Sequence, residues 1–357
     1  MKRLFTLALL LLLSVASYAQ LRNSDVYECP QMNKSGIREN IHIPNIAGYK
    51  TLKCDFHLHT VFSDGSVWPD IRISEAWQQG LDAVAITDHI EYRPHKNIIN
   101  ADLNESFKIA KKRADAIGII AIKGIEITRA KPLGHLNALF ITDANPMDVK
   151  DPLQAIDVAL SQGAFIMWNH PGWPDDKSTV YDVHKKLISE NKIHGVEVVN
   201  CMEYYPSIIT FCKENKLAYM GNSDAHDAIA NDYGACKTAR PMTLVFAKEC
   251  TESSLKEAMM AKRTAVVFAD TYFGPADLME QLIKASVEIK VINKNDKTAN
   301  VNLTNNSDIT LQLKIGSANI TIPADKTVVA KVALSGKVTV LNCYTAENTN
   351  LEFAYPY

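Results

Sequence analysis

The stretch Leu52-Lys53-Cys54-Asp55-Phe56-His57-Leu58-His59-Thr60 is a short apolar run that ends in two histidines. Alternate side chains of a strand point the same way, so His57 and His59 can face one common site. Further short apolar runs follow along the chain to about residue 246, and helix-like amphipathic segments separate them. This alternation predicts an α/β fold.

Eight strands and six helices are expected in this part of the chain. The strands are expected at 52–57, 83–87, 119–125, 136–141, 164–168, 195–199, 218–220 and 243–246. The helices are expected at 71–79, 103–117, 153–161, 180–190, 208–215 and 253–261. Repeated strand–helix units imply a parallel sheet with helices outside it, and seven or eight such units favour a closed, TIM-like barrel.

The sequence changes character after about residue 277, where apolar and polar residues alternate, as in Val287-Glu288-Ile289-Lys290-Val291. We expect no long helix there, and the pattern predicts a small all-β, sandwich-like accessory domain at 277–357. The barrel is expected at 50–276, after an irregular lead-in at 20–49.

The N-terminus has the order of a secretory signal peptide. A basic start, Met1-Lys2-Arg3, precedes an apolar run over 4–13 and small residues that end at Ala19. The apolar run is about ten residues long, short of the roughly 20 that span a bilayer. We therefore expect residues 1–19 to be removed and the protein to be exported, periplasmic or secreted, with no membrane span after cleavage.

The composition is that of an ordinary globular protein, with 357 residues, 47% of them hydrophobic and 22% charged. The formal net charge is −2. This charge argues against a general nucleic-acid-binding surface, which needs an excess of Lys and Arg. A stable nucleic-acid partner is therefore not expected.

Six of the ten histidines and three carboxylates lie where expected strands end or begin. They are His57, His59, Asp64, His89, Glu126, His135, His170, Asp224 and His226. In a parallel barrel the carboxyl ends of the strands meet on one face, where such barrels carry their active sites. Imidazole and carboxylate bind divalent metals, and nine such groups suit two or three ions rather than one. The spacing predicts a metal centre on this face.

The successive motifs around these residues resemble those of the PHP (polymerase and histidinol phosphatase) family, over roughly residues 50–270. The motifs are Asp55-Phe56-His57-Leu58-His59-Thr60, Ala85-Ile86-Thr87-Asp88-His89, Gly124-Ile125-Glu126, Asn169-His170-Pro171 and Ser223-Asp224-Ala225-His226. The resemblance implies a metal-dependent phosphoesterase with a distorted TIM-like (β/α)7 barrel and a trinuclear centre of Mn, Zn or Fe.

The resemblance also implies how the ligands divide among the ions. The first ion would take His57, His59, Glu126 and Asp224, the second Glu126, His135 and His170, and the third Asp64, His89 and His226. Many members carry His at the position of Asp64. A carboxylate there favours a harder ion such as Mn²⁺ or Fe²⁺, and zinc remains an alternative.

Closely spaced divalent ions lower the pKa of a shared water and stabilise charge on phosphoryl oxygens. The expected reaction is attack of a metal-bridging hydroxide on phosphorus. We count Asp224 among the catalytic residues as well as the ligands, and expect Arg93, His95 and Arg129 to contact phosphate or protonate the leaving group. Asp88 and Asn169, each next to a ligand histidine, are expected to orient it.

A small-molecule phosphodiester is the expected substrate. A diester needs an open, partly apolar rim, and five aromatic residues fall in expected active-face loops: Trp68, Tyr92, Trp173, Tyr204 and Tyr205. The sequence around 60–69 and 88–95 is also similar to exported bacterial PHP phosphodiesterases. The alternatives are a phosphomonoesterase of the histidinol-phosphatase type, a metal-binding scaffold without turnover, and a proofreading nuclease. Of the other histidines, we expect His184 at the surface and His194 on the opposite face.

Overall fold

The computed structural model describes residues 37–99, 102–234, 240–334 and 336–354. The predicted signal peptide at 1–19, and the lead-in up to residue 36, lie outside these residues. From Arg38 onward the chain forms one compact unit. None of the helices in the described ranges combines the length and the apolar character that crossing a bilayer requires.

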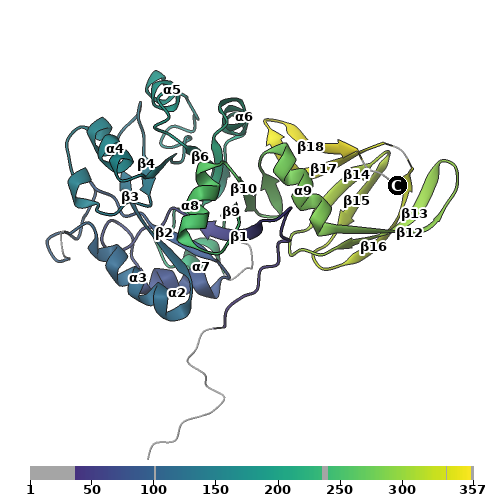
Figure 1. Cartoon of the computed structure of the whole chain (residues 1–357), viewed down its shortest axis with the longest axis horizontal. Coiled ribbons are helices and arrows are strands. Elements are labelled where there is room, and N and C mark those ends of the chain that lie inside the picture. The colour runs from purple at the N-terminus through teal and green to yellow at the C-terminus, as the bar shows by residue number, and fades with distance from the viewer. Residues whose placement is uncertain (1–36, 100–101, 235–239, 335, 355–357) are drawn as a thin grey trace, which may run out of the picture. The chain divides into compact units, whose positions relative to one another are not determined.

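The N-terminal part is a barrel of buried strands with helices packed outside it (Figure 1). Two parallel blocks make up most of it: β1 (Lys50–Asp55), β2 (Ala83–Ile86) and β3 (Ile120–Ile127), and then β5 (Phe165–Trp168), β6 (Gly195–Asn200) and β8 (Ala218–Asn222). Every residue of β2, β5, β6 and β8 is buried. Strands buried on both faces read as continuous apolar runs, which is why the sequence located them.

The outer helices also lie close to their expected positions. They are α2 (Pro69–Gln78), α3 (Glu105–Ile117), α4 (Pro152–Ser161), α5 (Asp182–Ser189), α6 (Pro206–Asn215) and α8 (Glu252–Met260). Three of them begin with proline, whose missing N–H costs nothing in the first turn. The Asp151 side chain accepts a hydrogen bond from the Leu153 amide and so caps α4.

The sheet is mixed, which corrects the expectation of a wholly parallel one. Strand β4 (Leu136–Leu139) runs antiparallel to both β3 and β5. Only residues 128–135 separate β3 from β4, and a crossover between parallel strands needs about a dozen residues or more. The start of β4 therefore lies at the same edge as the carboxyl ends of β3 and β5.

The barrel closes through side chains and a close backbone approach. Strand β9 (Met242–Ala247) pairs antiparallel with β1 and with β10 (Thr264–Phe268). The Gly221 amide of β8 donates to Thr243 Oγ1 of β9 at 2.9 Å. A Cβ at Gly221 would lie 2.1 Å from a methyl of Val266 in β10, so only glycine allows this approach.

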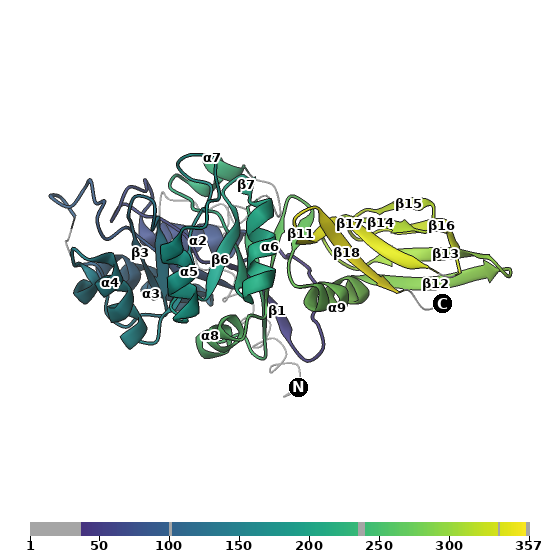
Figure 2. The ribbon, with the colours of Figure 1, turned by 90° about the horizontal axis from the view of Figure 1, so that it is seen from above.

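The C-terminal part is a sandwich of two antiparallel sheets that share one core (Figure 2). The first sheet comprises β12 (Val287–Lys294), β13 (Thr298–Asn305) and β16 (Thr327–Ala333). The second comprises β14 (Leu311–Ile315), β15 (Ala318–Ile322), β17 (Lys337–Ala346) and β18 (Thr349–Ala354). Buried and exposed residues alternate along β14, as the period-two pattern predicts.

Helix α9 (Ala276–Ser286) corrects the expectation that no long helix follows residue 277. Its buried residues include Leu278, Met279, Leu282 and Ile283, which recur at the spacing of one helix face. The strand-like alternation of the sequence begins only at Val287, where α9 ends.

The strand β11 (Thr271–Phe273) joins the two parts, because it pairs with β10 of the barrel and with β17 of the sandwich. A short hairpin strand, β7 (Glu203–Tyr204), pairs with the end of β6. The Tyr204 ring lies 5.4 Å from the Phe273 ring and 6.5 Å from the Tyr344 ring, which anchors this hairpin on β11 and β17. The remaining short helices are η1 (Asn145–Met147) and α7 (Ile229–Tyr233).

Candidate metal centre

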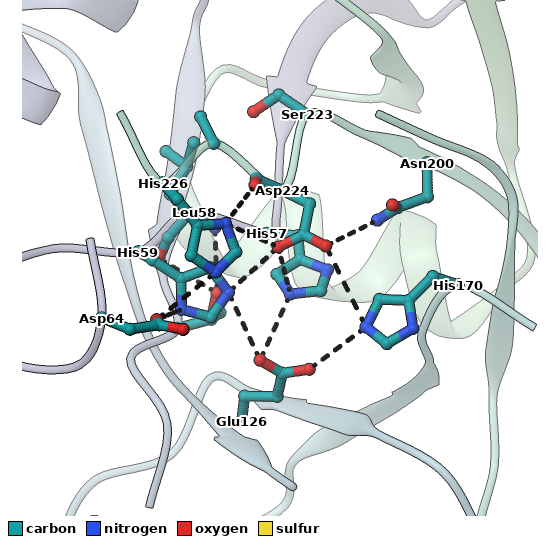
Figure 3. A network of polar contacts seen from close by, with 12 residues as sticks. His57, Leu58, His59, Asp64, Glu126, His170, Asn200, Ser223, Asp224 and His226 are labelled. Atoms are coloured by element: carbon teal, nitrogen blue, oxygen red, sulfur yellow. Dashed lines mark hydrogen bonds and ion pairs between the residues drawn. The ribbon is translucent and has the colours of Figure 1, made fainter. Parts of the chain in front are cut away.

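The structure brings the nine predicted metal ligands together at one end of the barrel. Figure 3 labels His57, His59, Asp64, Glu126, His170, Asp224 and His226 among them. Their ligand atoms form four overlapping groups, within each of which all atoms lie within 4.8 Å of one another. The groups are His57, His59 and Asp224; His57, Glu126 and His170; His89, Glu126 and His135; and His59, Asp64, His89 and His226. His59 thus stands near Asp64 as well as Asp224, a proximity that the sequence did not indicate.

Glu126 and Asp224 are the central carboxylates of the cluster. His59 Nε2 lies 3.0 Å from Asp224 Oδ1 and 3.3 Å from Glu126 Oε2. His57 Nε2 lies 3.2 Å and 3.4 Å from the same two oxygens. The other oxygen of Glu126, Oε1, is 3.0 Å from His135 Nδ1. Each carboxylate therefore faces several imidazole nitrogens at once.

A second group of ligand atoms surrounds Asp64, beside the two central carboxylates. Its Oδ1 lies 3.4 Å from His89 Nε2 and 3.3 Å from His226 Nε2. The rings of His59 and His226 are stacked with centroids 4.1 Å apart, and the His89 ring lies 4.4 Å from His59. Three imidazoles thus surround one oxygen of Asp64.

Five buried atoms of the cluster have no hydrogen-bond partner among the residues that the structure describes: His57 Nε2, His59 Nε2, Asp64 Oδ1, Glu126 Oε2 and Asp224 Oδ1. An unpartnered buried polar atom costs about 1–3 kcal/mol, so five in one place call for a shared partner. Ligands bound about 2.0–2.2 Å from one ion lie about 3.0–3.5 Å apart, depending on geometry. The separations between these nitrogen and oxygen atoms fall in that range, so the residues fit divalent metal ions.

Electrostatics within the cluster keep the carboxylates ionised. Burial alone would raise the pKa of Glu126, but His89 and His57 hold that pKa well below its usual range. Burial alone would lower the pKa of His89, but Glu126 and Asp64 raise it to about 10. For His59, burial and the neighbouring His89 lower the pKa to about 4. Without metal, protons therefore occupy part of the cluster, and metal binding must displace them.

Two of the ligand residues have an uncommon backbone conformation. His170 has φ 25° and Asp224 has φ 52°, a region that non-glycine residues adopt rarely. The extension of β1 fixes the second of these, because the Asp224 amide donates to the His57 carbonyl at 3.0 Å and the His59 amide donates to Ala225 at 3.1 Å. Such backbone strain is typical of functional sites.

A buried carboxylate that the sequence analysis missed, Glu197, supports the centre from behind. Its Oε1 lies 3.0 Å from His57 Nδ1, and its Oε2 accepts the His170 amide at 2.7 Å. Asn200 and Asn222 donate to the same carboxylate, which is fully buried in β6. A carboxylate behind a ligand imidazole fixes its orientation and raises its basicity. The one available signal was a lone acid inside an apolar strand.

Asp55, the first residue of the opening motif, lies outside the metal cluster and has a positioning role. It accepts hydrogen bonds from the Ser223 hydroxyl at 2.5 Å and from the His57 amide at 3.3 Å, and it pairs with Arg240 at 2.7 Å. Burial raises the pKa of Asp55, and Arg240 partly offsets this rise. The buried guanidinium of Arg72 donates to the carbonyls of His59 and Ala225. These contacts tie the loop after β1 to the loop after β8.

Asp88 and Asn169 contact partners other than those expected. Asp88 accepts hydrogen bonds from Thr60 and Ser63, and Ser63 Oγ lies 3.3 Å from His59 Nδ1, so Asp88 orients His59 indirectly. Asn169 donates to Glu126 Oε1 at 2.9 Å rather than orienting the adjacent histidine. His89, next to Asp88, instead has its Nδ1 2.6 Å from Thr128 Oγ1.

The structure does not bring the three residues expected at the phosphate into the metal cluster. Arg93 pairs with Asp148 at 3.0 Å, and His95 is exposed. Arg129 pairs with Glu91 and donates to the carbonyls of 149 and 150. Arg129 instead lines a small side cavity of about 120 Å³, which shares His135 and His170 with the metal centre.

His184 and His194 are buried structural residues. The expectation of a surface position for His184 is wrong, because it is 1% exposed, its Nε2 lies 2.7 Å from the Leu133 carbonyl and its ring stacks on Trp168. His194 accepts the Ile166 amide at 2.9 Å, outside the cluster, as its position before β6 indicates.

A cavity of about 660 Å³ opens over the cluster. Its lining comprises Asp64, His89, Tyr92, Glu126, Thr128, His135, His170, Trp173, Asn200, Cys201, Glu203, Tyr205, Asp224 and His226. Tyr92, Trp173 and Tyr205 are the aromatic members of this wall, whereas Trp68 and Tyr204 lie exposed elsewhere. The volume suits a small-molecule site, which commonly measures about 300–1,000 Å³.

Comparison with known proteins relates this centre to one family. The family model of the PHP domain matches residues 55–219. The chain is 37% identical to a two-domain protein from Bacteroides vulgatus that contains a predicted PHP-like metal-dependent phosphoesterase, and its crystal structure superposes with a TM-score of 0.86 over 90% of this chain and 100% of that one.

Two further relatives are more distant. The uncharacterized protein MJ1295 of Methanocaldococcus jannaschii is 36% identical over 81 residues, 23% of this chain, and the match spans about a third (36%) of its length. The lesion-specific endonuclease Q of Pyrococcus furiosus is 17% identical with a TM-score of 0.42, over 59% of this chain and 56% of that one.

Three observations indicate the same family: the order of the sequence motifs, the clustering of the ligand atoms, and the relative that matches along its whole length. The His, Asp and Glu side chains that meet at the barrel mouth fit divalent metal ions, and the two-domain relative contains a predicted PHP-like metal-dependent phosphoesterase. The chain therefore belongs to the PHP family of metal-dependent phosphoesterases.

Proposed function

We propose that this protein is a metal-dependent phosphodiesterase for small-molecule substrates. The main support for this proposal is the set of residue types that line the cavity. Among the described residues that line the cavity there is no Lys and no Arg, whereas Tyr92, Trp173 and Tyr205 are present. A phosphate monoester carries one more negative charge than a diester and gains more from Arg or Lys clamps, while a diester has a second organic group that aromatic faces can contact.

The roles of the chain's own residues follow from their contacts. The nine clustered side chains would hold two or three divalent ions of Mn, Zn or Fe, and Asp64 favours a hard ion in its group. Such ions, when bound, activate water and stabilise the charge that builds on phosphoryl oxygens. Glu197 and Ser63 fix the ring orientations of His57 and His59, so these side chains need little reorganisation when substrate binds.

The proposal predicts which of two model esters the protein cleaves. Purified protein supplied with Mn²⁺ or Zn²⁺ should hydrolyse bis(p-nitrophenyl) phosphate with a kcat/KM at least about 10-fold above that for p-nitrophenyl phosphate, and EDTA should abolish both activities. The release of p-nitrophenolate measures both reactions. Turnover of the monoester alone would support a phosphomonoesterase, and no turnover with metal bound would support a scaffold. Either outcome rejects the proposal.

We also propose that the protein is exported and acts on its substrate outside the cytoplasm. The support is the basic start, the apolar run over 4–13 and the small residues before position 20. Fractionation of cells that express the full chain should recover a protein beginning at Gln20 in the periplasm or medium. A cytoplasmic protein that retains Met1 would contradict export.

A further inference from the structure

Glu203 is a carboxylate in the cavity wall that the metal cluster leaves unused. Four carboxylates line the cavity, and three of them, Asp64, Glu126 and Asp224, belong to the metal groups. Glu203 belongs to none of the groups found among the described residues. Within the described ranges it also forms no ion pair with Lys, Arg or His. Glu203 is exposed at the cavity wall, so its negative charge is hydrated and is not paired with a cationic side chain of the described residues.

The β6–β7 hairpin fixes the position of this carboxylate relative to the metal centre. Glu203 is the antiparallel partner of Asn200, so the two side chains share one face of the hairpin. Asn200 Nδ2 lies 3.4 Å from Asp224 Oδ2 (Figure 3). The strand partner of Glu203 therefore contacts Asp224, one of the two central carboxylates of the metal cluster.

The neighbours of Glu203 hold it in place. The buried Tyr205 donates its hydroxyl hydrogen bond to Glu203 Oε2 at 3.3 Å. Tyr204, on the opposite face of the hairpin, packs against Phe273 and Tyr344 of β11 and β17. The hairpin is therefore anchored through its other face. Glu203 thus lies on a fixed part of the cavity wall.

A fixed negative charge beside the metal centre repels anionic substrates, and the strength of this repulsion depends on the charge of the substrate. It repels a phosphate monoester dianion more than a diester monoanion, and it attracts a cationic group on the second alcohol. The aromatic wall residues Tyr92 and Trp173 add faces that bind cationic groups favourably. Resting on the proposed phosphodiesterase function, we propose that Glu203 determines specificity by selecting diesters whose second alcohol is uncharged or, preferably, carries a cationic amine.

Three esters with the same leaving group test this inference. They are p-nitrophenyl phosphate, bis(p-nitrophenyl) phosphate and p-nitrophenyl phosphorylcholine, in which the group beside the reacting phosphate is anionic, uncharged and cationic, respectively. Loss of one charge in a partly hydrated cavity should change kcat/KM by roughly 5- to 30-fold. Relative to the bis-ester, Glu203→Gln should lower kcat/KM for the phosphorylcholine ester by that factor and raise kcat/KM for the monoester.

Controls separate a charge effect from a structural one. Glu203→Asp should restore the wild-type order of the esters, and Glu214→Gln, which removes an exposed carboxylate on α6, should change none of the three values. The effect of Glu203→Gln should shrink at 1 M NaCl, because salt screens charges in a hydrated cavity. If Glu203→Gln changes kcat/KM for the phosphorylcholine ester and the bis-ester by the same factor, the inference is wrong while the phosphodiesterase function stands. If the wild-type protein with metal cleaves neither diester, the proposed function itself fails.

Discussion

Glu126→Gln is expected to lower diester turnover by on the order of 10³-fold and to reduce the metal content of the purified protein. The two oxygens of Glu126 lie within 3.6 Å of nitrogens from five histidines, His57, His59, His89, His135 and His170. Glutamine has nearly the same shape but no charge, and its NH₂ group presents a donor where the centre needs an acceptor. The variant therefore removes the shared carboxylate without leaving a void.

Metal analysis by mass spectrometry and the p-nitrophenolate assay measure the two effects. Glu203→Gln serves as the matched control for metal content, because it makes the same change at a cavity carboxylate outside the metal groups. Far-UV circular dichroism of Glu126→Gln should match the wild type, which shows that the barrel still forms. A folded variant that keeps full metal content and full activity would refute the assigned centre.

In the metal-free protein, the free energy of unfolding is expected to fall as the pH rises from about 6.5 to 9. Neighbouring carboxylates outweigh burial and raise the pKa of His89 to about 10, and they also raise the pKa values of His170 and His226. A raised histidine pKa contributes stability that is complete below the unfolded value near 6.5 and is lost as pH approaches the folded value. Each such imidazole contributes a slope of up to about 1.4 kcal/mol per pH unit.

The carboxylates act in the opposite direction at low pH. The pKa values of Asp224 and Glu126 are held well below their usual range by the facing imidazoles, against the effect of burial. Their contribution is therefore present above about pH 4.5 and is lost on acidification. The metal-free protein should be most stable between about pH 4.5 and 6.5, and metal should bind more tightly as the pH rises because it displaces protons.

Urea unfolding of EDTA-treated protein at several pH values measures this dependence, with metal-loaded protein as the comparison. The metal-loaded protein should lose little stability between pH 6.5 and 9, since its imidazoles are already deprotonated. In calorimetry, the heat of metal binding should vary with the ionisation enthalpy of the buffer, which reports the released protons. A metal-free protein that becomes more stable over this range would contradict the proton-filled cluster.

The sequence located the elements of the barrel because their patterns are local. Continuous apolar runs such as 83–86 and 165–168 became fully buried strands, and helices began at prolines. The direction of β4 was misjudged, although the few residues before it already exclude a parallel crossover. Helix α9 was missed because the alternating pattern that starts at Val287 was extended too far towards the N-terminus.

The candidate site shows the same division. His57 and His59 were recognisable because alternate residues of an extended segment share one face, and this segment continues past the end of β1, as the Leu58–Ala225 bridge shows. The roles expected for Arg93 and Arg129 at the phosphate rested only on their loop positions, and the structure pairs them with Asp148 and Glu91. Nothing local marks the partner of a loop arginine, because that partner comes from a distant segment.

The residue types and their spacing alone determined that imidazoles and carboxylates would gather at the ends of strands, because a strand dictates where its own side chains point. Only the tertiary structure decided which carboxylate faces which imidazole, that the reversed β4 brings His135 to the same edge, and that Glu197 and Glu203 stand behind and beside the centre. The physical reason is that these contacts join segments far apart in the chain, so they exist only once the barrel has closed.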